Sequence, residues 1–126
     1  MYRIILLVGG GSFAGGICRY LIQQVIQARY PSSIPLGTLT VNILGCFIIG
    51  IIFGFGEKGN VLSPEMRLLL ATGFCGGFTT FSSFAYENVA LVQSSEYYYT
   101  IGYIVLSVVL GFIAVYLGLI LVKLIF

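Results

Sequence analysis

Four long apolar segments, separated by short polar connections, account for nearly the whole chain. Each is close to the length of about 20 residues that an α-helix needs to cross the hydrocarbon core of a bilayer. We place them at Ile4–Gln27, Leu36–Gly56, Leu68–Val92 and Tyr97–Val122. The pattern therefore predicts an all-α integral membrane protein with four transmembrane helices, folded as a single membrane domain over residues 1–126.

The third apolar segment contains a stretch that a regular membrane helix would not be expected to have. Residues 72–84 read TGFCGGFTTFSSF. Glycines and adjacent threonines weaken a helix, and hydroxyl groups can replace missing backbone partners. At membrane depth a broken helix is tolerated only where protein or a watery cavity surrounds it, and its half-helix ends commonly face ions. We expect the helix to end near Gly76–Thr79 and to resume near Thr80.

Small residues recur at a spacing of four and predict close helix packing. The pairs are Gly11 and Gly15, Gly50 and Gly54, and Gly73 and Gly77. The sequence has no internal repeat, and four helices are few to enclose a pathway within one chain. Any conduit is therefore expected to form between subunits. The short connections include Ser63-Pro64-Glu65, which has the pattern of a helix N-cap followed by the first helical turn.

Composition supports a membrane location and argues against an enzyme. Only 8% of the residues are charged, against roughly 25% in a soluble domain. There is no histidine, the four acidic residues are scattered, and the three cysteines form no C-x-x-C pair. These features disfavour a transition-metal site or a hydrolytic centre. The net charge of +2 is too small to indicate a nucleic-acid partner.

The cations give a weak signal for orientation. Four spans place both ends of the chain on one side, together with Arg3, Lys58, Arg67 and Lys123. Arg29 lies on the opposite side, so the positive-inside rule favours a cytoplasmic N-terminus. The apolar run Ile4–Val8 is too short for the core of a signal peptide, and the first segment is therefore predicted to be a retained helix.

Polar side chains follow a spacing of four on two of the predicted spans. Thr38 and Asn42 share a face of the second span, and Tyr103, Ser107 and Gly111 share a face of the fourth. Polar groups at membrane depth are costly unless paired, so each is a functional candidate. Hydrogen bonds between helices and donation to a partly dehydrated anion both explain the pattern, since the amide of Asn42 offers N–H donors.

Aromatic residues after the predicted break and charged residues inside the spans add two further candidates each. Phe81 and Phe84 fit either core packing or contact of their positive ring edges with a small anion. The half-helix that follows Thr80 would add N–H groups at its N-terminus, whereas the carbonyls before it suit a cation. Arg19 can anchor a helix end or line an aqueous vestibule. Glu87 can pair with a hydroxyl or an arginine, or take part in transport.

Three stretches together resemble the Fluc (CrcB) family of fluoride channels. They are GGGSFAGGICRY at residues 9–20, PLGTLTVNILG at 35–45 and GFCGGFTTFSSF at 73–84. They occur in the family's order and the resemblance covers nearly the whole chain. The pattern G-x-x-G-G-x-T-T-F-S-x-F is highly specific.

The resemblance implies a passive channel that exports fluoride from the cytoplasm across a bacterial inner membrane. It implies an antiparallel, dual-topology homodimer in the lipid bilayer, with two pores at the subunit interface. The implied fluoride-pathway residues are Asn42, Phe81, Phe84, Tyr103, Ser107 and Thr38, with Glu87 flanking the polar track and Arg19 in a vestibule. A structural sodium ion would be held by the backbone carbonyls of Gly76 and Thr79 in both subunits.

Two features depart from the family's pattern. Gly111 occupies a position at which some relatives carry a further serine. A chain that inserts in both directions also needs nearly balanced cations, and the four-to-one count does not provide that balance. A second, oppositely inserted chain is the alternative partner, but the homodimer is favoured because this one chain carries the complete set of pore residues.

Two other functions fit the sequence less well than a channel does. A small dual-topology drug/proton antiporter needs a carboxylate in its first helix, and Ile4–Gln27 contains none. A non-transporting membrane assembly or insertion factor would explain the glycine faces. It would not explain polar stripes on separate helices together with a broken third helix.

Overall fold

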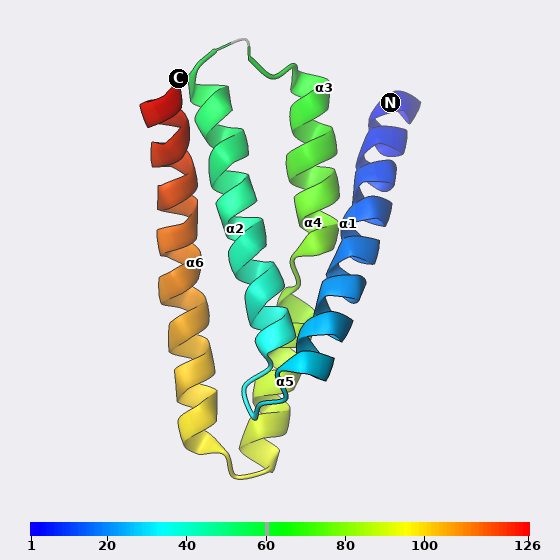
Figure 1. Ribbon diagram of the computed structural model, residues 1–126. Helices are drawn as coiled ribbons and strands as arrows, with labels where there is room; N and C mark the ends of the chain where they lie inside the picture. The colour runs from blue at the N-terminus through cyan, green and yellow to red at the C-terminus, as the bar shows by residue number, and fades with distance from the viewer. Residues whose placement is uncertain (60) are drawn as a thin grey trace.

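The structure is a computed structural model that describes residues 1–59 and 61–126, and helices make up most of them (Figure 1). The helices are α1 (Tyr2–Arg29), α2 (Leu36–Glu57), α3 (Pro64–Arg67), η1 (Leu68–Cys75), α4 (Gly76–Phe78), α5 (Phe81–Gln93) and α6 (Tyr97–Ile125). Segments α3, η1, α4 and α5 follow one another along a single span, Pro64–Gln93, in which η1 is a π-helix.

The four predicted spans are present as four helices that are long and apolar enough to cross a membrane. The protein is therefore a multi-pass membrane protein. The third span begins at Pro64 and not at Leu68, because Ser63 caps it: the Ser63 hydroxyl accepts a hydrogen bond of 3.1 Å from the Met66 N–H. The predicted cap was right, and the start taken from the apolar run was four residues late.

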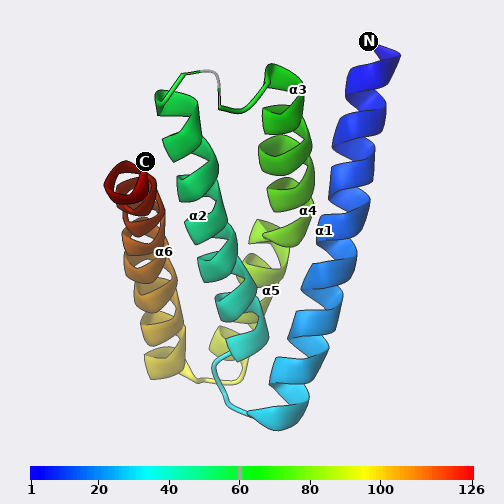
Figure 2. The ribbon, with the colours of Figure 1, turned by 45° about the horizontal axis from the view of Figure 1, so that its top comes forward.

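At the end that carries both termini the spans lie in the order α6, α2, third span, α1, whereas toward the other end α5 passes behind α2 and packs beside α6 (Figures 1 and 2). Both chain ends lie at the same end of the molecule, as an even number of spans requires (Figure 1). Glycines set the closest approaches, as predicted. A Cβ atom at Gly11 or Gly15 would overlap the carbonyl oxygens of Leu69 and Phe74, and one at Gly50 would overlap that of Val115. Close backbone packing between membrane helices depends on such small residues.

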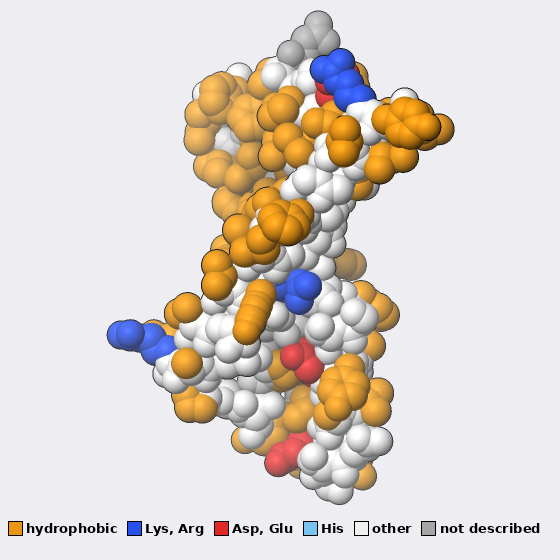
Figure 3. Space-filling view, turned by 90° about the vertical axis from the view of Figure 1, so that its right-hand side faces the viewer, with side chains coloured by type: hydrophobic (Ala, Val, Ile, Leu, Met, Phe, Trp, Pro, Cys, Tyr) orange, Lys and Arg blue, Asp and Glu red, His pale blue; other side chains and the backbone are white. Residues whose placement is uncertain are grey.

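Charged groups are few and concentrate near the ends of the helices. At the end that carries both termini, Arg3 pairs with Glu65 at 2.8 Å and Lys123 with Glu57 at 3.6 Å. Between the ends, most of the face seen in Figure 3 is apolar or uncharged, but a basic and an acidic side chain lie near its middle. Many large apolar side chains are exposed along the helices, which suits contact with lipid.

Candidate functional site

The third span is interrupted where the sequence predicted. Helix α4 ends at Phe78 and α5 begins at Phe81, and Thr79 and Thr80 between them have extended backbones (Figure 1). The Thr80 hydroxyl caps α5 by accepting a 3.2 Å hydrogen bond from the Ser83 N–H. The break therefore gives α5 a true helix N-terminus at membrane depth.

The side chain of Asn42 supplies backbone partners at this break. The Thr80 N–H donates to Asn42 Oδ1 at 2.8 Å, and Asn42 Nδ2 donates to the Thr80 carbonyl at 3.1 Å. Both polar groups of an extended residue are thereby satisfied by one amide from α2. The sequence left two roles open for Asn42, a hydrogen bond between helices and donation to an anion. The first of these is present in the structure. The amide nitrogen carries a second hydrogen beyond the one that bonds Thr80.

The backbone carbonyl groups that precede the break differ in the hydrogen-bond donors that they meet. Arg19 Nε donates to the Gly77 carbonyl at 3.1 Å, which ties α1 to α4. The Thr79 N–H and hydroxyl both donate to the Cys75 carbonyl at 2.9 Å. The Gly76 carbonyl loses its usual α-helical partner, the N–H of Thr80, because that group donates to Asn42. A carbonyl released in this way at a helix C-terminus is suited to a cation.

A polar cluster joins all four spans beside the break. Thr38 Oγ1 donates to Glu87 Oε2 at 2.8 Å, and the Tyr103 hydroxyl donates to Glu87 Oε1 at 2.9 Å. Gln23 Nε2 donates to Thr38 Oγ1 at 3.1 Å. Of the partners left open for Glu87, the structure thus contains hydroxyl groups. Gln23 was not among the predicted site residues, although a polar residue four positions after Arg19 on a membrane span was a usable signal.

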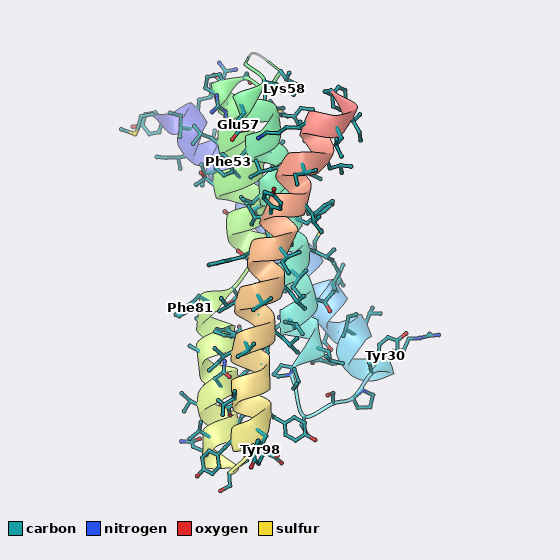
Figure 4. The ribbon with its side chains drawn as sticks, turned by 90° about the vertical axis from the view of Figure 1, so that its left-hand side faces the viewer. Tyr30, Phe53, Glu57, Lys58, Phe81 and Tyr98 are labelled. Carbon is teal, nitrogen blue, oxygen red and sulfur yellow. The ribbon has the colours of Figure 1, made fainter. Side chains whose placement is uncertain are left out.

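The two phenylalanines lie together but in different surroundings. Their ring centroids are 6.0 Å apart, and Phe84 meets the Tyr103 ring edge-on at 5.0 Å. Phe84 is partly buried against the core that includes Leu39 and Tyr103. Phe81 is 78% exposed at the start of α5 (Figure 4). Core packing thus accounts for Phe84, whereas the ring of Phe81 touches Phe84 but keeps most of its surface exposed.

A cavity of about 460 Å³ lies between α2, the break and α6. It is lined by Asn42, Gly45, Cys46, Ile49, Thr79, Thr80, Phe81, Phe84, Ser107, Val108, Gly111, Phe112 and Val115. Ser107 Oγ is buried and, among the described residues, has no hydrogen-bond partner. A Cβ atom at Gly111 would lie 3.4 Å from Cys46 Sγ, so the glycine keeps this wall free of a side chain. Because Phe81 and Phe112 are exposed, the cavity opens at the surface of the chain.

The predicted site residues therefore fall into three groups. Asn42, Phe81, Phe84 and Ser107 meet at the cavity. Thr38, Glu87 and Tyr103 form the polar cluster, which does not line the cavity and contacts it through Phe84. Arg19, Gly76 and Thr79 lie at or beside the end of α4, and Thr79 also lines the cavity.

Comparison with known proteins identifies the family. The family model described as CrcB-like protein, Camphor Resistance (CrcB), matches residues 6–119. A protein of Gloeothece citriformis (strain PCC 7424), named fluoride-specific ion channel FluC, is 50% identical over 123 residues, which cover 98% of each chain. A protein of the same name from Chlorobium phaeobacteroides (strain BS1) is 46% identical over 123 residues, covering 98% of this chain and 95% of its own. The chain belongs to the CrcB family.

Proposed function

We propose that the protein is a passive, fluoride-selective ion channel, not an enzyme, and that it exports fluoride from the cytoplasm across the inner membrane of a bacterial cell. The observation that carries the proposal is the cavity beside the helix break, which is lined both by the amide of Asn42 and by the Ser107 hydroxyl, a buried group with no partner among the described residues. Fluoride is small and strongly hydrated, so its passage requires protein donors that replace water. The names of the relatives support fluoride as the ion.

The proposed path uses each group in a distinct way. Ser107 O–H and the second N–H of Asn42 donate to the ion at the cavity. The ring edges of Phe81 and Phe84 offer weak positive contacts that do not trap it. Thr38, Tyr103 and Glu87 form a polar track, which continues the path beyond Phe84. Arg19 bonds Gly77 through Nε alone and keeps its other guanidinium donors for an anion in a vestibule.

We propose that two copies pair in antiparallel orientation and enclose two such paths at their interface. Within one chain the cavity is open at the surface and Phe81 is largely exposed, so a second copy is needed to close the path. One chain carries all the proposed pore residues, which favours two identical copies over two different chains. The four-to-one cation count still favours one orientation, so a second chain of opposite bias is the alternative.

We propose that a structural sodium ion lies at the centre of this dimer, held by the carbonyls of Gly76 and Thr79 from both copies. The donor set fits a hard cation, since these are backbone oxygens at a helix C-terminus and Gly76 is released from its helical hydrogen bond. Gly76 is also exposed, which leaves its carbonyl accessible to a shared site. The ion would neutralise the negative ends of the two broken helices.

Replacing sodium with N-methyl-D-glucamine is expected to lower the unfolding temperature of the purified protein. A bound ion stabilises the folded state by about 2.7 kcal/mol when its concentration is 100 times Kd. The measurement is the fraction of protein that stays monodisperse after heating, with exchange of chloride for gluconate as the control. An unfolding temperature that does not depend on sodium would contradict the ion site.

Fluoride efflux from liposomes that contain the purified chain tests the channel itself. We expect rapid fluoride release, read with a fluoride electrode, and retention of chloride. Phe81→Ile removes the ring edge and is expected to slow release at least about tenfold, which corresponds to roughly 1.4 kcal/mol on the barrier. Phe13→Ile is the matched control, since Phe13 is similarly exposed at 72% and does not line the cavity. No release from well-folded protein would overturn the homodimeric channel.

A further inference from the structure

We propose that Gln23 is a positioning residue of the fluoride path: its amide holds the Thr38 hydroxyl so that the single proton of this hydroxyl points to Glu87. The inference rests on the proposed function above and assigns a role to a helix, α1, that contributes no lining residue to the cavity.

The direction of the hydrogen bonds follows from the chemistry of the groups. The amide nitrogen of Gln23 only donates, so Thr38 Oγ1 accepts the 3.1 Å bond from Gln23 Nε2. The single proton of the Thr38 hydroxyl is then left for the 2.8 Å contact with Glu87 Oε2. Tyr103 donates to the other carboxylate oxygen at 2.9 Å. Every donor in the chain from Gln23 onward therefore points toward Glu87.

A threonine two residues away shows what happens without such a donor. Thr40, on the same helix, donates its hydroxyl proton to the Leu36 carbonyl of its own helix at 2.7 Å. This back-bonding is the usual choice of a helical threonine. Thr38 is fully buried, so water cannot hold its hydroxyl in another direction. The bond from Gln23 and the carboxyl group of Glu87 together keep the Thr38 proton directed toward Glu87.

Backbone packing fixes Gln23 at this level. Gly37 directly precedes Thr38, and a Cβ atom at Gly37 would lie 3.1 Å from Gln23 Cα and 3.2 Å from the Gln23 carbonyl oxygen. The two helices therefore approach closely because Gly37 has no side chain. Gln24, the next residue on α1, is exposed. The position of Gln23 is thus set by helix packing and does not depend on a mobile side chain alone.

The arrangement has a consequence for an ion that passes the polar track. The hydroxyls of Thr38 and Tyr103 are both committed to Glu87, so either must turn its proton away from the carboxylate to donate to fluoride. A hydroxyl that also accepts a hydrogen bond is a stronger donor. Gln23 supplies that bond to Thr38 and keeps its oxygen in place while the proton turns. Loss of Gln23 would leave the donor weaker and free to bond within its own helix.

The test compares two equivalent substitutions in the purified, liposome-reconstituted chain. Gln23→Leu is expected to slow fluoride efflux about tenfold, the usual size of one lost hydrogen bond in such a network. Gln24→Leu makes the same change one residue further along α1 and is expected to leave efflux unchanged. In a Thr38→Val background, Gln23→Leu should cause no further slowing, because its partner hydroxyl is absent.

An infrared difference spectrum supplies a readout that a purely structural role would not move. Gln23→Leu is expected to shift the carboxylate stretching band of Glu87, which is assigned as the band lost in Glu87→Gln. Gln24→Leu should not shift it. An unshifted band, or equal slowing by Gln23→Leu with and without Thr38→Val, in a chain that conducts fluoride overturns the role of Gln23 alone. A wild-type chain that releases no fluoride overturns the proposed function itself, and with it the transport role of Gln23.

Discussion

Asn42→Ala is expected to abolish fluoride release and also to destabilise the protein. The substitution removes the partners of the Thr80 N–H and carbonyl, which Asn42 now bonds at 2.8 and 3.1 Å. An unpaired backbone group in a buried site costs about 1–3 kcal/mol, and two are created here. The cheapest response is for the Thr80 N–H to return to the Gly76 carbonyl and close the helix through the break. That change would remove the free start of α5 and one wall of the cavity.

The measurement pairs efflux from liposomes with thermal unfolding of the purified protein. Thr40→Ala is the matched control, because the Thr40 hydroxyl bonds only its own helix at Leu36 among the described contacts. Asn42→Asp is informative as well, since a carboxylate can accept from the Thr80 N–H but cannot donate to the Thr80 carbonyl. We expect it to fail like Asn42→Ala.

Two outcomes would change this interpretation of Asn42. If Asn42→Ala lost efflux at an unchanged unfolding temperature, the amide would act on transport as a hydrogen-bond donor to the anion, and its bonds to Thr80 would not contribute to stability. If Asn42→Ala released fluoride at the wild-type rate, Asn42 would be neither. Both results are distinct from the expected joint loss of efflux and stability.

The parts of the fold that sequence predicted are those decided by local chemistry. Apolar runs of membrane length fix four spans, and glycines beside paired threonines mark the break at Thr79 and Thr80. The start of the third span shows the limit of that reasoning. Its first turn, Pro64–Arg67, is polar because it lies near the helix end, so the apolar run begins later than the helix.

The parts of the site that sequence could not predict depend on which helix faces which. Thr38 and Asn42 share a helix face by spacing, yet Thr38 bonds Glu87 and Asn42 bonds the break. Phe81 and Phe84 also share a face, but the break immediately before Phe81 leaves that ring exposed while Phe84 packs on Tyr103. Such differences arise from tertiary packing, which the spacing of residues within one helix does not contain.

The partners of Arg19 and Gln23 illustrate the same limit on α1. Their spacing of four places both on one face of the helix, but only the approach of α1 to α4 and α2 determines what each one bonds. The glycines of α1 permit the approach to α4. The packing of this one helix therefore controls contacts at both the break and the polar cluster.

Gly15→Ala is consequently expected to destabilise the protein far more than Gly16→Ala. A Cβ atom at Gly15 would overlap the Phe74 carbonyl oxygen and lie 2.9 Å from the Phe78 N–H nitrogen. These are backbone atoms of η1 and α4, which cannot rotate aside as a side chain can. Overpacking of a tight contact costs about 1–3 kcal/mol, and α1 would have to move away from α4 to relieve it. The bond from Arg19 to the Gly77 carbonyl would be lost with that movement.

Gly16→Ala provides the matched control because the two glycines are adjacent on one helix. A Cβ atom at Gly16 meets no atom within 4 Å, and alanine favours a helix over glycine by about 1 kcal/mol. This variant should therefore be as stable as the wild type or more so. The comparison is the fraction of each variant that stays monodisperse on gel filtration after heating in detergent. Equal loss from both variants would show that helix propensity, and not the contact of α1 with η1 and α4, determines the role of these glycines.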